Sequence, residues 1–210
     1  MSENNQKRER TPLYTFCRVV FGFLFHTVCP IKYYNRQVLD RAEAPYLLIS
    51  NHKTAVDPFV LAYVTKKYEI RFVGKRELAG SKLAQWFLSQ LHMIPISRHA
   101  TDMAAMRSCM QVLREGKVLG IFPEGTRHQP ELMQTVESGT AMIALRAGVP
   151  IIPVYLNGPV RLFHRVHAWV GEPIPIDDIK AQGISTDTIQ QLCQRIQETY
   201  YAMRDTDKQA

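Results

Sequence analysis

The residues of this chain best suited to chemistry are His52 and Asp57, in the segment SNHKTAVDP between two apolar runs. A carboxylate bonded to one imidazole nitrogen fixes the tautomer and orients the ring, so that the other nitrogen can remove a proton from a hydroxyl. The same spacing fits a simple helix cap, because aspartate and proline are common where a helix begins. From the spacing alone, a capped turn that happens to contain a histidine is the commoner structure.

A second polar segment, FPEGTR at residues 122–127, follows another apolar run. Gly125 lets a ligand approach the backbone, Thr126 offers a hydroxyl, and Arg127 presents a planar fork that matches phosphate. Glu124 is suited to fixing the arginine or to accepting a hydrogen bond from a substrate hydroxyl. An ordinary turn with a surface ion pair explains the same residues without any ligand.

Further cations follow two other short apolar runs. Lys75 and Arg76 come after the run 70–74, and Arg98 comes after the run 93–96. If the runs are parallel strands, these side chains reach the same sheet edge as the two polar segments. The sequence therefore predicts an anion site at that edge.

The elements that must position these residues alternate between short apolar runs and helical patterns. The runs are continuous rather than alternating, which predicts an α/β fold with a mostly parallel central sheet flanked by helices. The expected strands are 46–50, 70–74, 93–96, 118–122, 151–156 and 166–170. The expected helices are 57–67, 82–90, 101–115, 136–147 and about 185–203, and residues 31–39 are expected to be helical as well.

The N-terminal region combines basic and apolar residues. Three basic side chains precede Thr11, and the stretch 12–28 is strongly apolar. It is short against the roughly 20 apolar residues that span a bilayer. A helix there either packs into the core or lies in one leaflet, with its basic neighbours on anionic headgroups. We expect a membrane-associating segment, 1–40, followed by a domain, 41–210.

Composition narrows the classes of partner and chemistry. The net charge of +7 favours anionic partners. A nucleic-acid binder is disfavoured, because aromatic residues are not interleaved with the basic ones and zinc-finger spacing is absent. A metallohydrolase using His52 and Asp57 with His164 and His167 is disfavoured too, because the two later histidines have the wrong phase for ligands on one strand face.

Four motifs in order give the chain a resemblance. The segments NHxxxxD at 51–57, KxEL at 75–78, FPEGTR and the proline-bearing run 149–154 resemble the motifs of the glycerolipid acyltransferase family. The resemblance runs from about residue 46 to 172 and is strongest to bacterial members that act on 1-acylglycerol-3-phosphate. Two departures, His128 in place of a common serine and the non-basic segment 136–138, concern the choice of acceptor rather than the chemistry.

The resemblance implies a mechanism. His52 would be the general base, oriented by Asp57, that deprotonates the free hydroxyl of 1-acylglycerol-3-phosphate for attack on an acyl thioester. A G-x-S-x-G nucleophile segment is absent, which fits direct attack by the substrate alcohol. The product would be phosphatidic acid, made in phospholipid synthesis. The residues implied to hold the acceptor phosphate are Lys75, Arg76, Arg98, Glu124, Gly125, Thr126 and Arg127.

The resemblance also implies partners and a location. The donor would be acyl-CoA or acyl carrier protein, and we expect no metal and no cofactor. Both substrates carry long acyl chains, so the family likeness favours an interfacial helix at 12–28 and a monotopic enzyme on the cytoplasmic face of the membrane. The remaining alternatives are a family member acting on glycerol-3-phosphate or another lysophospholipid, and a non-catalytic membrane-surface or nucleic-acid-binding protein.

Overall fold

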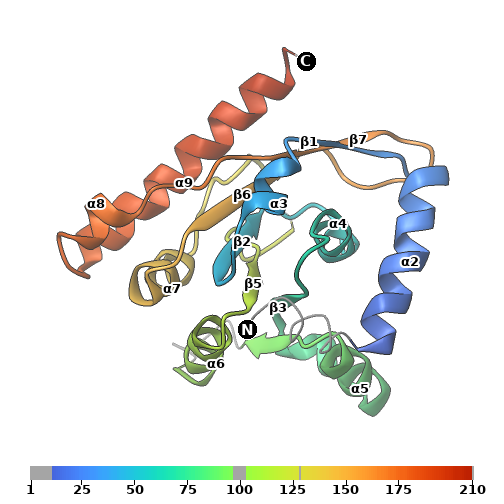
Figure 1. The fold of residues 1–210 in the computed structure, drawn as a ribbon, viewed down its shortest axis with the longest axis horizontal. Helices are drawn as coiled ribbons and strands as arrows, with labels where there is room; N and C mark the ends of the chain where they lie inside the picture. Colours follow the sequence, from blue (N-terminus) through green and yellow to red (C-terminus); the bar gives the residue numbers. More distant parts are fainter. Residues whose placement is uncertain (1–10, 97–102, 128, 210) are drawn as a thin grey trace.

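One sheet organises the molecule (Figure 1), in a computed structural model that describes residues 11–209 except 97–102 and 128. Its seven strands have the order β1-β7-β6-β2-β5-β3-β4. The strands are β1 (Ile31–Tyr34), β2 (Tyr46–Ser50), β3 (Ile70–Lys75), β4 (Ile94–Ile96), β5 (Val118–Ile121), β6 (Ile151–Leu156) and β7 (Val166–Val170). Every neighbouring pair is parallel except β6 and β7. The predicted α/β fold with a mostly parallel sheet is confirmed.

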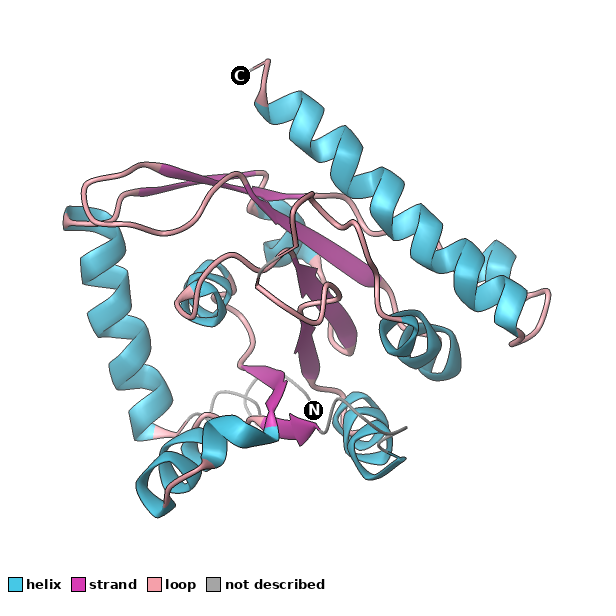
Figure 2. Cartoon of the chain, turned by 180° about the vertical axis from the view of Figure 1, so that it is seen from behind, coloured by secondary structure: helices cyan, strands magenta, loops and turns pink. Residues whose placement is uncertain are grey.

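Helices cover both faces of this sheet (Figure 2). They are α2 (Pro12–Thr27), α3 (Gln37–Arg41), α4 (Asp57–Val64), α5 (Lys82–Gln90), α6 (Met103–Arg114), α7 (Ser138–Ala147), α8 (Asp177–Lys180) and α9 (Thr186–Asp207), with a 3-10 turn η2 (Arg76–Ala79). One apolar core lies between the sheet and α6, α7 and α9, and a second lies on the other face under α4 and α2. The central strands are therefore buried on both sides, as their continuous apolar runs predicted.

The N-terminal part of the chain corrects one expectation. Residues 31–34 form a strand, not a helix, because their backbone pairs in parallel with β7, from Ile31 opposite Val166 to Tyr34 opposite Trp169. The Tyr34 and Trp169 rings stack across this pair with centroids 3.9 Å apart. The partner strand lies far along the chain, so the local pattern could not reveal the pairing. A helix, α3, begins only at Gln37.

The apolar helix α2 has one buried and one exposed face. Thr11 caps it, accepting the Tyr14 N–H through Oγ1, and Pro12 occupies the first turn. On the inner face, Phe21 stacks on Phe59 of α4 with ring centroids 4.0 Å apart. On the outer face, Phe23 is 71% exposed. Among the residues described, no helix is long and apolar enough to cross a membrane.

Strand register brings three loops to one edge of the sheet. β5 lies between β2 and β3, with Ile121 opposite Ile49 and Gly120 opposite Phe72. All three strands are parallel, so their carboxyl ends point the same way. The segments that follow them, including SNHKTAVDP and FPEGTR, therefore leave the sheet side by side.

Candidate active site

The histidine and aspartate of the first segment are in direct contact. His52 Nδ1 lies 2.9 Å from Asp57 Oδ2. The imidazole is 18% exposed, whereas the Asp57 carboxylate is fully buried. With Nδ1 engaged by the carboxylate, Nε2 is the nitrogen left to exchange a proton. The pair predicted from sequence is thus formed in the fold.

The turn between the two residues is folded around Asp57. Its Oδ2 accepts the backbone N–H of Lys53 at 2.6 Å and of Thr54 at 2.8 Å, and its Oδ1 accepts the Thr54 hydroxyl. All these bonds are made to the turn before α4, and the N-cap position of the helix is Val56. Asp57 is therefore not the helix cap that its position suggested. These donors fix the orientation of the carboxylate.

Glu124 links the two loops. Its Oε2 accepts the backbone N–H of His52 at 2.7 Å, and its Oε1 accepts the backbone N–H of Met133 at 3.0 Å. The residue is only 2% exposed. Both oxygens are already engaged, which differs from the direct phosphate contact expected from sequence. The geometry gives Glu124 the task of fixing the backbone of His52.

The FPEGTR turn needs its glycine. Gly125 has φ +65°, and an added Cβ would lie 2.8 Å from Glu137 Oε1. Its N–H donates to the Phe122 carbonyl and closes the turn. Thr126 is half-buried beyond this turn and Arg127 is exposed. The loop therefore presents an exposed arginine at the sheet edge where His52 lies.

Two of the other predicted cations are also at this edge. Lys75 is the last residue of β3 and Arg76 the first of η2, and both are exposed. Since Phe72 lies opposite Gly120, Lys75 is level with the start of the FPEGTR loop. Arg98 lies outside the described residues. Lys75 and Arg76 therefore follow the carboxyl end of β3, next to the end of β5 from which the FPEGTR loop leaves.

Sequence reasoning missed two residues that hold the histidine. Asn51 is fully buried and exchanges two hydrogen bonds of 2.8 Å with the backbone of Leu156, which ties the end of β2 to β6. Phe122 stacks on the His52 ring, with centroids 4.1 Å apart. Neither residue type signals chemistry alone. The signal available was position, since each directly adjoins a strand end that carries a polar loop.

A metal centre finds no support among the residues described. No group of three or more His, Cys, Asp or Glu side chains in that part of the chain is placed to hold an ion. His167, considered above as a ligand, instead has Nδ1 2.7 Å from Asp207 Oδ1.

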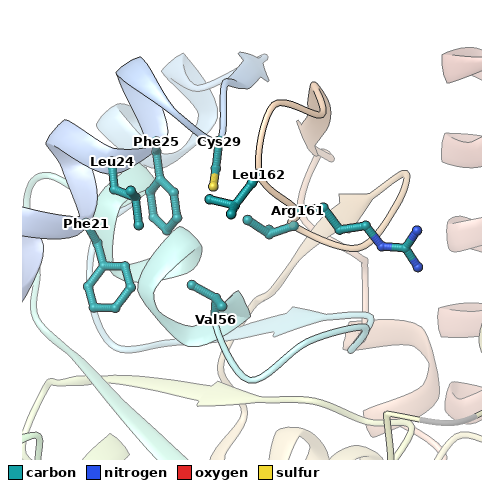
Figure 3. A pocket seen from close by; sticks show the side chains of 8 residues that line it. Phe21, Leu24, Phe25, Cys29, Val56, Arg161 and Leu162 are labelled. Atoms are coloured by element: carbon teal, nitrogen blue, oxygen red, sulfur yellow. The ribbon is translucent and has the colours of Figure 1, made fainter.

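An apolar hollow of about 430 Å³ adjoins the loop of His52 and Asp57. Val56, from that loop, forms part of its wall (Figure 3). The other side chains come from α2 and from the loops after α2 and β6: Phe21, Leu24, Phe25, Cys29, Val160, Arg161 and Leu162. The Arg161 guanidinium points away from the apolar side chains. The hollow has the lining that a fatty chain requires.

Comparison with known proteins fits this architecture. The sequence pattern of the family described as Acyltransferase matches residues 30–157. The chain belongs to this acyltransferase family. A 1-acyl-sn-glycerol-3-phosphate acyltransferase of Streptococcus pneumoniae is 31% identical over 203 residues, which cover 93% of this chain and 75% of that protein. The protein of the same name from Bacillus subtilis is 27% identical over 167 residues, covering 77% of this chain and 82% of its own length.

A solved structure shares the fold. The 1-acyl-sn-glycerophosphate acyltransferase PlsC from Thermotoga maritima matches with a TM-score of 0.69 over 98% of this chain and 84% of that one. The sequence identity is 19%, so this likeness concerns the fold.

Proposed function

We propose that this chain is a 1-acyl-sn-glycerol-3-phosphate O-acyltransferase, which moves a fatty acyl group from a thioester to the free hydroxyl of its acceptor and forms phosphatidic acid in phospholipid synthesis. The observation that carries the proposal is the contact of 2.9 Å between His52 Nδ1 and Asp57 Oδ2, beside the FPEGTR loop. Family membership and the names of the relatives support the same reaction.

The proposed chemistry uses the acceptor itself as nucleophile. His52 Nε2 takes the proton of the acceptor hydroxyl while the oxygen attacks the thioester carbonyl carbon. The C–S bond then breaks, and the imidazolium returns its proton to the departing thiolate. General-base assistance of this kind contributes about 10²–10⁴-fold. Asp57 stabilises the imidazolium and keeps Nε2 as the reactive nitrogen.

We assign the acceptor phosphate to the cations at the sheet edge. Arg127 offers a bidentate fork, Thr126 a hydroxyl, and Lys75 and Arg76 further positive charge. Gly125 allows close approach of the loop backbone. Arg98, outside the described residues, remains a predicted member of this group. Glu124 acts indirectly, because it holds the loop that carries His52.

The hollow beside Val56 is proposed to take a substrate acyl chain. It is apolar, and it borders the same loop as the catalytic pair. Holding both large substrates against His52 can remove roughly 7–11 kcal/mol from the barrier. The donor is proposed to be acyl-CoA or acyl carrier protein, with no cofactor and no metal in the reaction.

We further propose that the enzyme is monotopic and works on the cytoplasmic face of the membrane. The outer face of α2 supports this placement, because apolar side chains there are exposed while the inner face is packed on α4. A helix with this arrangement lies in the interface with its apolar side toward the acyl region.

The direct test is a substrate screen with the purified full chain. Lysophosphatidic acid, glycerol-3-phosphate and other lysophospholipids are each supplied with acyl-CoA or acyl carrier protein that has a labelled acyl chain, and products are identified by lipid mass spectrometry. We expect label in phosphatidic acid with lysophosphatidic acid as acceptor. Labelled lysophosphatidic acid from glycerol-3-phosphate, or another diacyl lipid alone, would replace the proposed acceptor. No transfer to any acceptor would contradict an enzymatic role.

A further inference from the structure

Exposed apolar side chains on the described part of the chain are concentrated on three segments. Eleven large apolar side chains are exposed there, and nine of them lie on α2, on η2 and α5, or on the loop 158–165. The nine are Phe16, Val19, Val20, Phe23, Leu78, Leu83, Trp86, Leu162 and Phe163. Scattered exposed apolar residues need no explanation, but a concentrated set marks an interaction surface.

The three segments adjoin one another along α2. At its beginning, the Thr11 hydroxyl donates to the Gln90 carbonyl at the end of α5, at 2.8 Å. At its other end, the Phe163 N–H donates to the Val28 carbonyl at 2.7 Å. Figures 1 and 2 both show α2 along one flank of the molecule, with α5 near one end of the helix. The exposed side chains therefore belong to one continuous flank.

We propose that this whole flank, not α2 alone, is the surface by which the enzyme binds an anionic lipid bilayer, with α5 and the loop 158–165 as two further membrane contacts. This proposal rests on the proposed acyl transfer at a membrane, and it adds the surface through which the enzyme binds that membrane. We call the outer face of α2, η2 with α5, and the loop 158–165 together the lipid flank.

Charge identifies the occupant of the lipid flank as an anionic membrane. Within the lipid flank, η2 carries one acidic residue, Glu77, beside Arg76, whereas the sequences of α2, of α5 and of the loop contain no Asp or Glu. The exposed cations of these segments are Lys82 in α5 and Arg161 and Arg165 in the loop. Apolar side chains flanked by cations fit the boundary between acyl chains and anionic headgroups, and each nearby cation adds about 1 kcal/mol.

The α5 helix has the side chains of an interfacial helix. Ser81 caps it through the Ala84 N–H, and Leu83 and Trp86, one turn apart, are 74% and 55% exposed. Tryptophan favours the membrane–water boundary, because its ring is apolar and its N–H is polar. These two residues would enter the bilayer beside the beginning of α2.

The loop 158–165 presents Phe163 in an unusual way. The side chain is 84% exposed, and its backbone has φ +57°, a left-handed conformation that non-glycine residues rarely adopt. An aromatic residue held outward at such a position indicates a function rather than a packing need. Its neighbour Leu162 lines the apolar hollow next to Val56. The loop therefore links the lipid flank to the apolar hollow beside the His52 loop, which would give a lysolipid an apolar route from the bilayer toward the site.

Vesicle partition tests the two new contacts. Leu83→Ser with Trp86→Ser, and separately Phe163→Asn, are compared with wild type on vesicles of phosphatidylcholine and phosphatidylglycerol, without substrate. Asparagine tolerates φ above zero, so the Phe163 variant keeps its loop. We expect each variant to partition at least about tenfold more weakly. The matched control, Met103→Ser with Ile184→Ser, removes exposed apolar side chains outside the flank and should partition as wild type does.

Tryptophan fluorescence locates α5 in the bound state. The chain has two tryptophans, Trp86 and Trp169. Wild-type emission should shift to the blue on vesicles and be quenched by brominated lipid. Trp86→Phe should abolish both changes, and adding Phe163→Trp to that variant should restore them. Lipid-bound protein whose Trp86 is neither shifted nor quenched would overturn the proposal.

The outcomes separate this surface from the proposed reaction. Activity on substrates dissolved in detergent should be unchanged in the Leu83, Trp86 and Phe163 variants. If the chain partitions as expected but transfers no acyl group, the proposed function is wrong and the lipid flank remains a membrane-binding surface. Unchanged partition, together with loss of self-association or of acyl carrier protein binding, assigns the flank to a protein partner and overturns the proposal.

Discussion

At the scale of single residues, His52 is fixed from several directions. Asp57 holds its Nδ1, Glu124 holds its backbone N–H, and Phe122 stacks on its ring. The spacing made His52 and Asp57 a candidate pair but favoured a capped turn, and the family resemblance was needed to predict that the two act together. The supports could not be predicted in this way, since Asn51 and Phe122 act through packing and backbone bonds that only the folded register creates.

Glu124 gives the first prediction at this scale. Glu124→Ala leaves the N–H groups of His52 and Met133 without their acceptor, and the displaced ring should lower kcat by on the order of 10²-fold. Glu124→Gln keeps one acceptor oxygen and should lose less. Steady-state kinetics against both substrates measures the effect, with the exposed Glu131→Gln as control. A raised acceptor KM at unchanged kcat would instead assign Glu124 to the phosphate.

Arg127 should behave differently, because it is exposed and is proposed to grip the acceptor phosphate. Arg127→Ala removes a charge-assisted bidentate contact, so the acceptor KM should rise about 10–100-fold. Arg127→Lys keeps the charge but loses the planar fork, so its acceptor KM should lie between the values of wild type and Arg127→Ala. Arg146→Ala, an exposed arginine on α7, is the control. An unchanged acceptor KM with a raised donor KM would place Arg127 on the thioester substrate.

At the scale of elements, the strands that carry the site follow from local sequence. β2, β5 and β6 are short apolar runs bounded by turn residues, so their positions could be predicted. β1 could not, since its strand conformation depends on pairing with β7. The antiparallel direction of β7 likewise depends on its pairing with β6, which no local sequence pattern encodes.

The end of α9 offers a test of one such distant contact. Asp207 Oδ1 accepts Trp169 Nε1–H at 2.6 Å and lies 2.7 Å from His167 Nδ1. Burial acts to raise the pKa of Asp207, but hydrogen bonds from His167, Trp169 and Asn157 hold that pKa below its ordinary value. The carboxylate thus ties the last helix to β7, the strand next to the edge strand β1.

Asp207→Ala should therefore lower the free energy of unfolding by roughly 1–2 kcal/mol at neutral pH. Because the folded pKa is depressed, this contribution is complete above the unfolded value of about 3.9 and disappears as pH falls through the folded one. Urea unfolding at neutral and strongly acidic pH, with Asp205→Ala as an exposed control, measures the difference. A difference between variant and wild type that grows toward acid would contradict this account.

At the scale of the whole molecule, composition and pattern predicted an α/β fold with a basic, apolar N-terminal region, and the family resemblance implied an enzyme. The structure adds that α2 is packed on α4 and exposed on its outer side. The sequence could not settle which face of α2 is buried, because most positions of the helix are apolar. Its placement depends on Phe59 and Tyr63 of α4, which are its partners in the fold.

Because α2 has one exposed and one buried face, substitutions on the first should affect membrane binding and substitutions on the second should affect stability. Val19→Ser with Phe23→Ser alters only exposed side chains and should release the protein from anionic vesicles while leaving circular dichroism and thermal unfolding unchanged. Phe25→Ala, on the buried face, should lower the free energy of unfolding by about 3–5 kcal/mol. Vesicle sedimentation and urea unfolding of both variants check this. If the outer-face variant sediments with vesicles as wild type does, α2 is not part of the membrane contact.

The central claim is that His52, oriented by Asp57, is the base that activates the acceptor hydroxyl. The most direct test is the initial rate of phosphatidic acid formation from lysophosphatidic acid by wild type and by His52→Ala, at matched folding judged by circular dichroism and thermal unfolding. The account predicts rapid formation by wild type and a rate at least about 10²-fold lower for the variant. A folded His52→Ala protein that forms phosphatidic acid at the wild-type rate would contradict it.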